Sequence, residues 1–329
     1  CKGDVFCMRA VLLWTINDFP AYGMLSGWST AGLLGCPICM ENSKAFRLRH
    51  GGKVSYFDCH RQFLPPNHHY RKDKKSFCKG RQENDSPLER LSGQEIFYRV
   101  CSLPTAIKEP IKKPPHYGRA HKWTKRSIFW DLPYWSSNLI RHNLDVMHIE
   151  KNVFDNVFNT IMDVKGKTKD NLKARKDVGI YCSRPGLAVN EDQTSKLLPK
   201  APYTLTKQQR KAVCEWLLEL RFPDGYASNF GRCVDMKDLK VSGFKSHDCH
   251  IFMQRLLPIA FKELLPSFIS NALTELSLFF QTICSTQLDT NKLIDLEKKV
   301  PVILCNLEKF LPPAFFDAME HLIIHLPYE

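Results

Sequence analysis

The sequence lacks any run of about 20 uninterrupted apolar residues, the length that a helix needs to cross a membrane. It has no charged-then-apolar leader at its start and begins at Cys1 rather than Met, so we expect a piece of a longer protein. No phosphate-cradling glycine loop, GxSxG motif or dinucleotide fingerprint occurs. The motifs therefore give no support to three classes of enzyme: ATPases, serine hydrolases and nicotinamide-dependent dehydrogenases.

A regular disulfide framework is also absent. The 13 cysteines are an odd number with irregular spacing, whereas disulfide-rich domains are short, secreted and even in their cysteine count. Reduced thiols in a cytosolic or nuclear protein fit this pattern better. Hydrophobic residues make up 43% of the 329 positions, which is enough for a sizeable core and excludes wholesale disorder.

The net charge of +13 is concentrated in one part of the chain. Residues 44–126 hold 20 Lys and Arg against 7 Asp and Glu, and the rest of the chain has as many acids as bases. A surplus confined to 83 residues indicates contact with a polyanion, nucleic acid first. A solvated loop is the alternative that charge alone leaves open.

An acid stands where an apolar run ends. Residues 5–18 read as a buried strand or strand pair, and Asp18 closes it immediately before the breakers Pro20 and Gly23. Asn-Asp before proline is ordinarily turn chemistry. Beside a second acid, the same carboxylate is placed to hold Mg²⁺ or Mn²⁺ through oxygen.

Apolar periodicity predicts several helices. The clearest spans 143–162, where Val146, Ile149, Val153, Val157 and Ile161 recur at spacings of three and four. Weaker patterns predict helices near 88–101 and 205–221. From 245 onward the chain reads as successive amphipathic helices separated by proline and polar breaks. That part is expected to pack as a helical module.

Two cysteines stand in a knuckle-like CxxC, Cys36 and Cys39, flanked by Gly and Pro. Together with His142 and His148 they would make a closed tetrahedral zinc site. Core cysteines and surface histidines explain the same residues equally well. The insertion offers competing ligands: Cys59, His60, His68, His69 and Cys78. Two pairs of histidines stand later in the chain at helical spacing, and for these we favour packing or partner contact: His247 with His250, and His321 with His325.

Long strings of the sequence resemble the transposases of plant CACTA-type, En/Spm-like DNA transposons. The resemblance is carried by "LLWTINDFPAYGMLSGWSTAGLLGCPIC", "FLPPNHHYRKDKKSF", "DLPYWSSNLIRHNLDVMHIEKNV", "GKTKDNLKARKD" and "VSGFKSHDCH". It covers nearly the whole chain. The last hundred residues are similar to the helical domain of unknown function that follows the catalytic region in that family.

The resemblance implies a DDE-type enzyme with an RNase H-like catalytic core. Such enzymes hold two divalent ions on three acids, and the ions stabilise the attacking and leaving oxygens of phosphodiester displacement. Asp18 resembles the second acid, and Glu150 is our choice for the third, with Asp145 in reserve. Cys36 and Cys39 match the family's CxxC, and His142 and His148 then resemble the complementary zinc ligands.

One departure concerns the first acid of the triad. In the family it lies in an upstream strand, and Asp4 does not match that motif. We therefore expect the chain alone to be inactive and to be truncated at both ends.

These observations predict an α/β protein with an incomplete RNase H-like core, a basic insertion and a mainly α-helical module. The expected domains are 1–165 for the partial core, with the insertion at 41–126, then 166–239 for a linker, then 240–329 for the helical domain.

The expected function of the intact protein is cleavage and joining of DNA strands at transposon ends, in the nucleus, with Mg²⁺ or Mn²⁺ and structural Zn²⁺. Its expected partners are terminal-repeat and target DNA, with no membrane; a homo-oligomer and a second transposon-encoded DNA-binding protein are compatible partners. Seven cations are the DNA-binding candidates: Arg71, Lys72, Lys74, Lys75, Lys122, Lys125 and Arg126. The alternative is a non-catalytic, zinc-stabilised derivative that binds DNA or chromatin.

Overall fold

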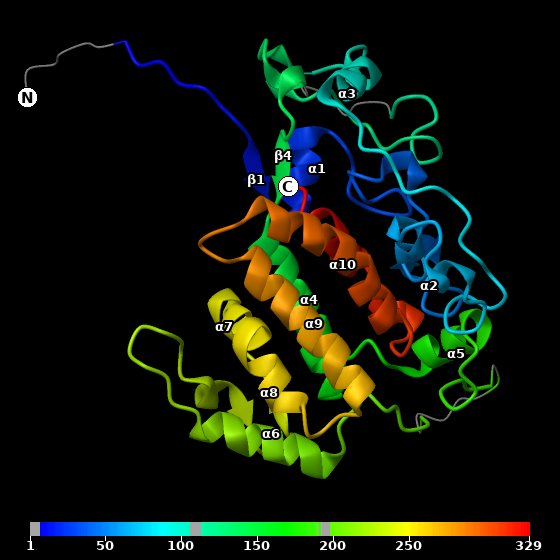
Figure 1. Ribbon diagram of the computed structural model, residues 1–329, viewed down its shortest axis with the longest axis vertical. Helices are drawn as coiled ribbons and strands as arrows, with labels where there is room; N and C mark the ends of the chain where they lie inside the picture. The colour runs from blue at the N-terminus through cyan, green and yellow to red at the C-terminus, as the bar shows by residue number, and fades with distance from the viewer. Residues whose placement is uncertain (1–6, 106–112, 191, 193–197) are drawn as a thin grey trace, which may run out of the picture. The chain divides into compact units, whose positions relative to one another are not determined.

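The computed structural model describes residues 7–105, 113–190, 192 and 198–329; Asp4 lies outside them. The chain mixes helices with a few short strands and divides into two compact units that alternate along the sequence (Figure 1). Unit 1 comprises 1–30, 89–145 and Glu329, and unit 2 comprises 31–88 and 146–328. The predicted basic insertion, 41–126, therefore contributes to both units.

Unit 1 is built around a parallel strand pair. β1 (Thr15–Asn17) runs beside β4 (His142–Leu144), with Ile16 opposite Asn143. Its helices are α1 (Phe19–Ser26) and α3 (Gly93–Val100), and 3₁₀ turns cover Ile128–Asp131 and Trp135–Ser137. α3 confirms the helix predicted near 88–101.

The expectation of a buried strand over 5–18 is wrong for most of its length. Within the described part of this run, 7–18, only Thr15–Asn17 forms a strand, and apolar side chains before it are exposed, among them Met8 at 76% and Val11 at 65%. The physical reason is pairing: the run is apolar enough for a core strand, but among the described residues only its last three find a partner strand, β4.

Local chemistry explains why the chain turns after β1. The side chain of Asp18 caps α1 by accepting a hydrogen bond from the Ala21 N–H at 2.8 Å, and Pro20 stands in the first turn, where its missing N–H costs nothing. Gly27 ends the helix at φ +85°, and a Cβ there would lie 2.2 Å from the carbonyl oxygen of Lys125. Only glycine fits that position without a shift of the backbone.

Unit 2 is mainly helical. Its helices are α2 (His69–Lys72), α4 (Val146–Ile161), α5 (Leu172–Tyr181), α6 (Lys207–Glu219), α7 (Ser246–Ile251), α8 (Leu257–Phe261), α9 (Ser267–Ile283), α10 (Thr290–Glu308) and α11 (Ala318–Leu322). A π-helical turn, Phe252–Leu256, joins α7 to α8. Two small antiparallel hairpins pair β2 (Phe46–Arg47) with β3 (Val54–Ser55) and β5 (Val234–Asp235) with β6 (Lys240–Val241). 3₁₀ turns lie at Met40–Asn42, His60–Phe63, Phe230–Cys233, Pro313–Phe315 and Ile323–His325.

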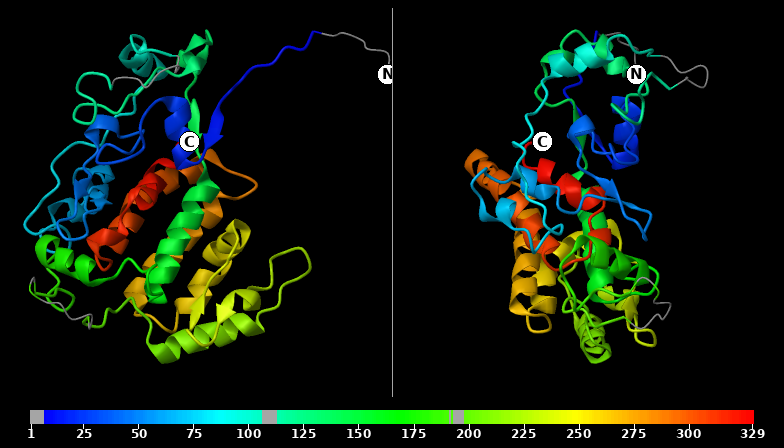
Figure 2. Two further views of the ribbon diagram at one scale, coloured as in Figure 1. Left: turned by 180° about the vertical axis from the view of Figure 1, so that it is seen from behind. Right: turned by 90° about the vertical axis from the view of Figure 1, so that its right-hand side faces the viewer.

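The core of unit 2 follows the predicted apolar face of α4. Ile149, Val153, Val157 and Ile161 are all buried, as their spacing requires. α7 packs against α4, and α9 packs against both α8 and α10 (Figure 1 and Figure 2). No described helix is long and apolar enough to cross a membrane.

Candidate metal centre

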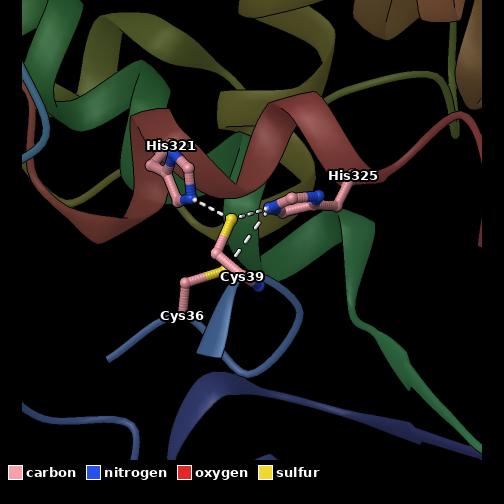
Figure 3. Close-up of side chains that lie close together, drawn as sticks. All are labelled: Cys36, Cys39, His321 and His325. Carbon is pink, nitrogen blue, oxygen red and sulfur yellow. Dashed lines mark hydrogen bonds between the residues drawn. The ribbon is translucent and has the colours of Figure 1, made fainter. Parts of the chain in front are cut away.

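Four buried side chains from the two ends of unit 2 meet at one point: Cys36, Cys39, His321 and His325. Figure 3 shows the cysteines on a tight loop and the two imidazoles facing them from the C-terminal segment. The loop is closed by the Met40 N–H, which donates to the Cys36 carbonyl at 2.9 Å. His321 lies in α11 and His325 in the 3₁₀ turn that follows, so their spacing of four residues puts both rings on one side.

The distances suit a tetrahedral ion. The Cys36 Sγ lies 3.3 Å from the His325 Nε2, and the Cys39 Sγ lies 3.3 Å from the His321 Nε2 and 3.4 Å from the His325 Nε2. Zinc bonds of ordinary length at tetrahedral angles put sulfur and nitrogen ligands about 3.6 Å apart. A small outward movement would therefore admit the ion, and the donor set is the one that zinc prefers.

Burial and the neighbouring side chains shift the pKa values of these ligands in both directions. Burial opposes ionisation of Cys36, but the hydrogen bond from Cys39 and the His325 and His321 rings bring the pKa of this thiol below its ordinary value. The hydrogen bond to Cys36, followed by burial, raises the pKa of Cys39. Burial lowers the pKa of His321 to about 4, which keeps its imidazole neutral. A thiolate and neutral imidazoles are the forms that ligate a metal.

Neighbouring side chains hold the His321 ring in place. Tyr56 stacks on it, with ring centroids 4.3 Å apart and planes at 14°. The Cys59 Sγ lies 3.6 Å from its Nδ1, which is the nitrogen that faces away from Cys39. Such an outer contact fixes which ring nitrogen is free for the metal. Cys59 and His60 also form a smaller group with His321, so two of the five competing ligands of the insertion lie next to the site.

The histidine partners differ from the predicted ones. His142 lies in β4 of unit 1, its Nδ1 is 2.8 Å from the Thr15 hydroxyl oxygen, and burial lowers its pKa to about 4. His148 lies in the first turn of α4 and is not a member of the four-residue group. The structure differs from this prediction: the rings that face the two cysteines are those of His321 and His325, for which we favoured packing or partner contact.

The predicted catalytic acids occupy different surroundings. Asp18 and Asp145 are the residues immediately after β1 and β4, and the Asp145 N–H continues the pairing by donating to the Asn17 carbonyl at 2.8 Å. Glu150 is 1% exposed inside unit 2, in contact with His250 and Gln254. Asp145, the reserve candidate, is thus the acid that stands beside Asp18.

A further carboxylate reaches the same strand edge. The Glu329 side chain accepts a hydrogen bond from the Leu144 N–H at 2.6 Å, directly before Asp145. Figure 1 places the C-terminal residue beside β4. Sequence reasoning did not single out Glu329, because it lies 184 positions after Asp145 and no spacing rule connects them.

The seven predicted DNA-binding cations fall into two groups, one in each unit. Lys72, Lys74 and Lys75 are exposed on unit 2. Arg71 is only 3% exposed, because its guanidinium donates to the backbone carbonyls of Arg61, Gln62, Leu64 and Asp85. Arg71 is therefore a structural cation in this fold.

The other three cations belong to unit 1 and are partly buried. Arg126 pairs with Asp131 at 2.8 Å, and the Lys122 ammonium lies 5.2 Å from the centre of the Tyr117 ring. Lys125 supplies the carbonyl that approaches Gly27. Lys122 and Lys125 keep part of their surface open to solvent.

Fold and site together define a mixed helix-and-strand protein with a buried two-cysteine, two-histidine cluster that can bind a metal such as zinc. Residues 1–103 match the family model described as transposase family tnp2, and residues 283–329 match a domain of unknown function, DUF4218, typical of plant transposase-like proteins. These two matches support a plant transposase-like protein, as the resemblance predicted. No curated protein and no solved structure matches it.

Proposed function

We propose that this chain is part of the catalytic region of a transposase that cleaves and joins DNA strands at transposon ends. The observation that carries the proposal is the edge of the β1–β4 pair. Asp18 and Asp145 follow adjacent parallel strands there, and the Glu329 carboxylate accepts from the residue before Asp145. Carboxylates at the carboxyl ends of neighbouring strands suit the RNase H-like core of the DDE enzymes, which we propose as the fold of unit 1.

The donor type at this edge suits Mg²⁺ or Mn²⁺, but the three carboxylates are not among the described groups whose ligand atoms lie within 4.8 Å of one another, so an ion would have to draw them together. All three side chains offer carboxylate oxygens, the ligands that these hard cations prefer. When bound, such ions stabilise the charge that develops on the phosphate during strand transfer. The chain's own contribution is placement: Asp18 is held by its cap on α1, and Asp145 by the bond of its N–H to β1.

The remaining parts of the proposal concern DNA. Exposed Lys72, Lys74 and Lys75 can neutralise phosphates, which requires no particular base sequence. We propose that transposon-end and target DNA are the partners, and that the protein acts in the nucleus, where that DNA lies. A homo-oligomer and a second transposon-encoded DNA-binding protein are compatible with this activity.

A non-catalytic, zinc-stabilised DNA- or chromatin-binding derivative is the second candidate. It is favoured by the same exposed lysines, because they and the cysteine–histidine cluster belong to unit 2, whereas the three acids belong to unit 1. DNA binding without divalent-ion binding at the strand edge would support it.

The strand-edge proposal is tested by Mn²⁺ binding. We expect Asp18→Asn, Asp145→Asn and Glu329→Gln each to weaken Mn²⁺ affinity by about tenfold, because each removes one anionic oxygen ligand. Electron paramagnetic resonance of free Mn²⁺ measures the affinity. Asp224→Asn, an exposed acid of unit 2, is the matched control and should leave it unchanged. Equal affinity in all four variants would refute the proposed edge site.

DNA binding is tested through its salt dependence. Replacing Lys72, Lys74 and Lys75 together with alanine should reduce the slope of log affinity against log salt concentration by about three, since each phosphate contact contributes nearly one. Fluorescence anisotropy with duplex DNA gives this slope. The triple variant of Lys292, Lys298 and Lys299, exposed lysines of α10, removes the same charge and is the control. An equal reduction of the slope in both triple variants would show that DNA binding depends on net charge rather than on a specific surface.

A further inference from the structure

A second group of metal-ligating side chains lies apart in sequence from the first: Glu150 of α4, His250 of α7 and Cys284 at the end of α9. The His250 Nδ1 contacts the Glu150 Oε2, and the Cys284 Sγ lies 3.9 Å from that oxygen. All three ligand atoms lie within 4.8 Å of one another. Zinc bonds of ordinary length at tetrahedral angles put oxygen and sulfur ligands about 3.6 Å apart, close to the separation found here.

One oxygen of this group is buried and unsatisfied. Glu150 is 1% exposed, and its Oε1 has no hydrogen-bond partner among the described residues. A buried carboxylate oxygen without a partner is costly, whereas a cation placed beside it removes that cost. The orphan oxygen is thus an observation separate from the grouping of the three ligands, and it points to a positively charged ligand.

The backbone around the group is also unusual. The π-helical turn Phe252–Leu256 begins two residues after His250 and contains Gln254. The Gln254 side chain lies 3.1 Å from the His250 Nδ1 and 3.4 Å from the Glu150 Oε2, and it donates to the Phe280 carbonyl at 3.2 Å. Short π-helical segments are frequent at functional sites, because they rotate side chains out of regular helical register.

Burial is the main cause of the pKa shifts in this group. It raises the pKa of Glu150 to about 8 and that of Cys284 to about 12, and it lowers the pKa of His250, with smaller contributions from His247 and Arg255.

We propose that Glu150, His250 and Cys284 form a second metal site that takes a borderline transition-metal dication of the zinc type. Oxygen, nitrogen and sulfur donors together suit Zn²⁺ or Co²⁺, whereas the thiolate makes the set unsuitable for Mg²⁺. Three protein ligands leave a fourth position for water or a small ligand, as in zinc sites that are not purely structural. The His250 side chain is 19% exposed, which gives solvent a route to the group.

This site is independent of both the cysteine–histidine cluster and the strand-edge acids. It shares no residue with Cys36, Cys39, His321 and His325. It also gives Glu150 a role other than the third catalytic acid, so failure of the DNA-cleavage proposal would leave it unaffected.

Cobalt binding tests the site. Full-length protein with zinc already bound at the cysteine–histidine cluster is titrated with Co²⁺, and absorption is recorded in the visible and near-ultraviolet. We expect one further equivalent, with a sulfur-to-cobalt charge-transfer band from Cys284. Cys284→Ser should abolish that band, and Cys233→Ser, a partly buried cysteine of the same unit, should leave it unchanged.

Glu150→Gln distinguishes loss of the metal site from misfolding of the protein. The amide can keep a hydrogen bond with His250 but carries no charge, so the protein should retain its circular dichroism spectrum and lose Co²⁺ affinity by more than tenfold. Persistence of the charge-transfer band in Cys284→Ser would overturn the proposal. So would a wild type that binds no equivalent beyond the first cluster.

Discussion

Cys39→Ser is expected to release zinc from the protein and to lower the free energy of unfolding of unit 2 by on the order of 5 kcal/mol or more. The loss is large because the ion would join two ends of the unit, a loop at 36–39 and the segment 321–325, which are almost 300 residues apart in sequence. Zinc per chain by mass spectrometry and the thermal unfolding midpoint measure the two effects. Cys101→Ser, which changes an exposed cysteine, should alter neither.

The histidines decide between two ligand sets. His321→Ala and His325→Ala should each lose zinc, whereas His142→Ala and His148→Ala should keep it. Retention of zinc in the first pair, or its loss in the second, would restore the set predicted from the sequence. Unfolding that is insensitive to chelation in wild-type protein would contradict a structural role for the ion altogether.

Local features of this protein follow directly from its sequence. The spacing of Ile149, Val153 and Val157 predicted the buried face of α4, and those side chains are buried. Turn chemistry is one of the two interpretations of Asp18 before Pro20, and the structure has a helix cap at that point. Both outcomes depend on residues within a few positions of one another, where helix period and capping chemistry are decisive.

Features that depend on distant contacts could not be read in this way. The pairs His142/His148, His247/His250 and His321/His325 are all plausible ligands by composition, and only the path of the chain brings the last pair to Cys36 and Cys39.

Arg71 illustrates the same limit for charge. It stands in the basic run 71–75 and reads as a surface cation. The carbonyls that bind it come from the 3₁₀ turn His60–Phe63 and Leu64 upstream and from Asp85 downstream, and their convergence is a property of the fold. Net charge therefore identified the basic region, but it did not show which of its Lys and Arg side chains face solvent.

A buried ion pair in unit 2 provides the second large effect. Arg175 is 1% exposed, and its guanidinium holds the Asp170 carboxylate through two nitrogens, with an Nη2–Oδ2 distance of 2.7 Å. Tyr203 adds a hydrogen bond to the same carboxylate at 3.1 Å, and the Leu187 carbonyl accepts from Arg175 at 3.1 Å. Asp170→Ala is expected to cost about 3–5 kcal/mol of unfolding free energy, because it leaves the Arg175 charge buried without its partner.

Urea denaturation followed by circular dichroism measures this cost, and two further variants separate its causes. Tyr203→Phe removes one neutral donor and should cost about 1 kcal/mol. Asp170→Leu combined with Arg175→Met removes both charges and should recover much of the lost unfolding free energy. The destabilisation in Asp170→Ala comes from the buried, unpaired Arg175 cation rather than from the absence of the ion pair. If the double variant were as unstable as Asp170→Ala, the carboxylate would be stabilising unit 2 through its contact with Tyr203, and the ion pair itself would contribute little.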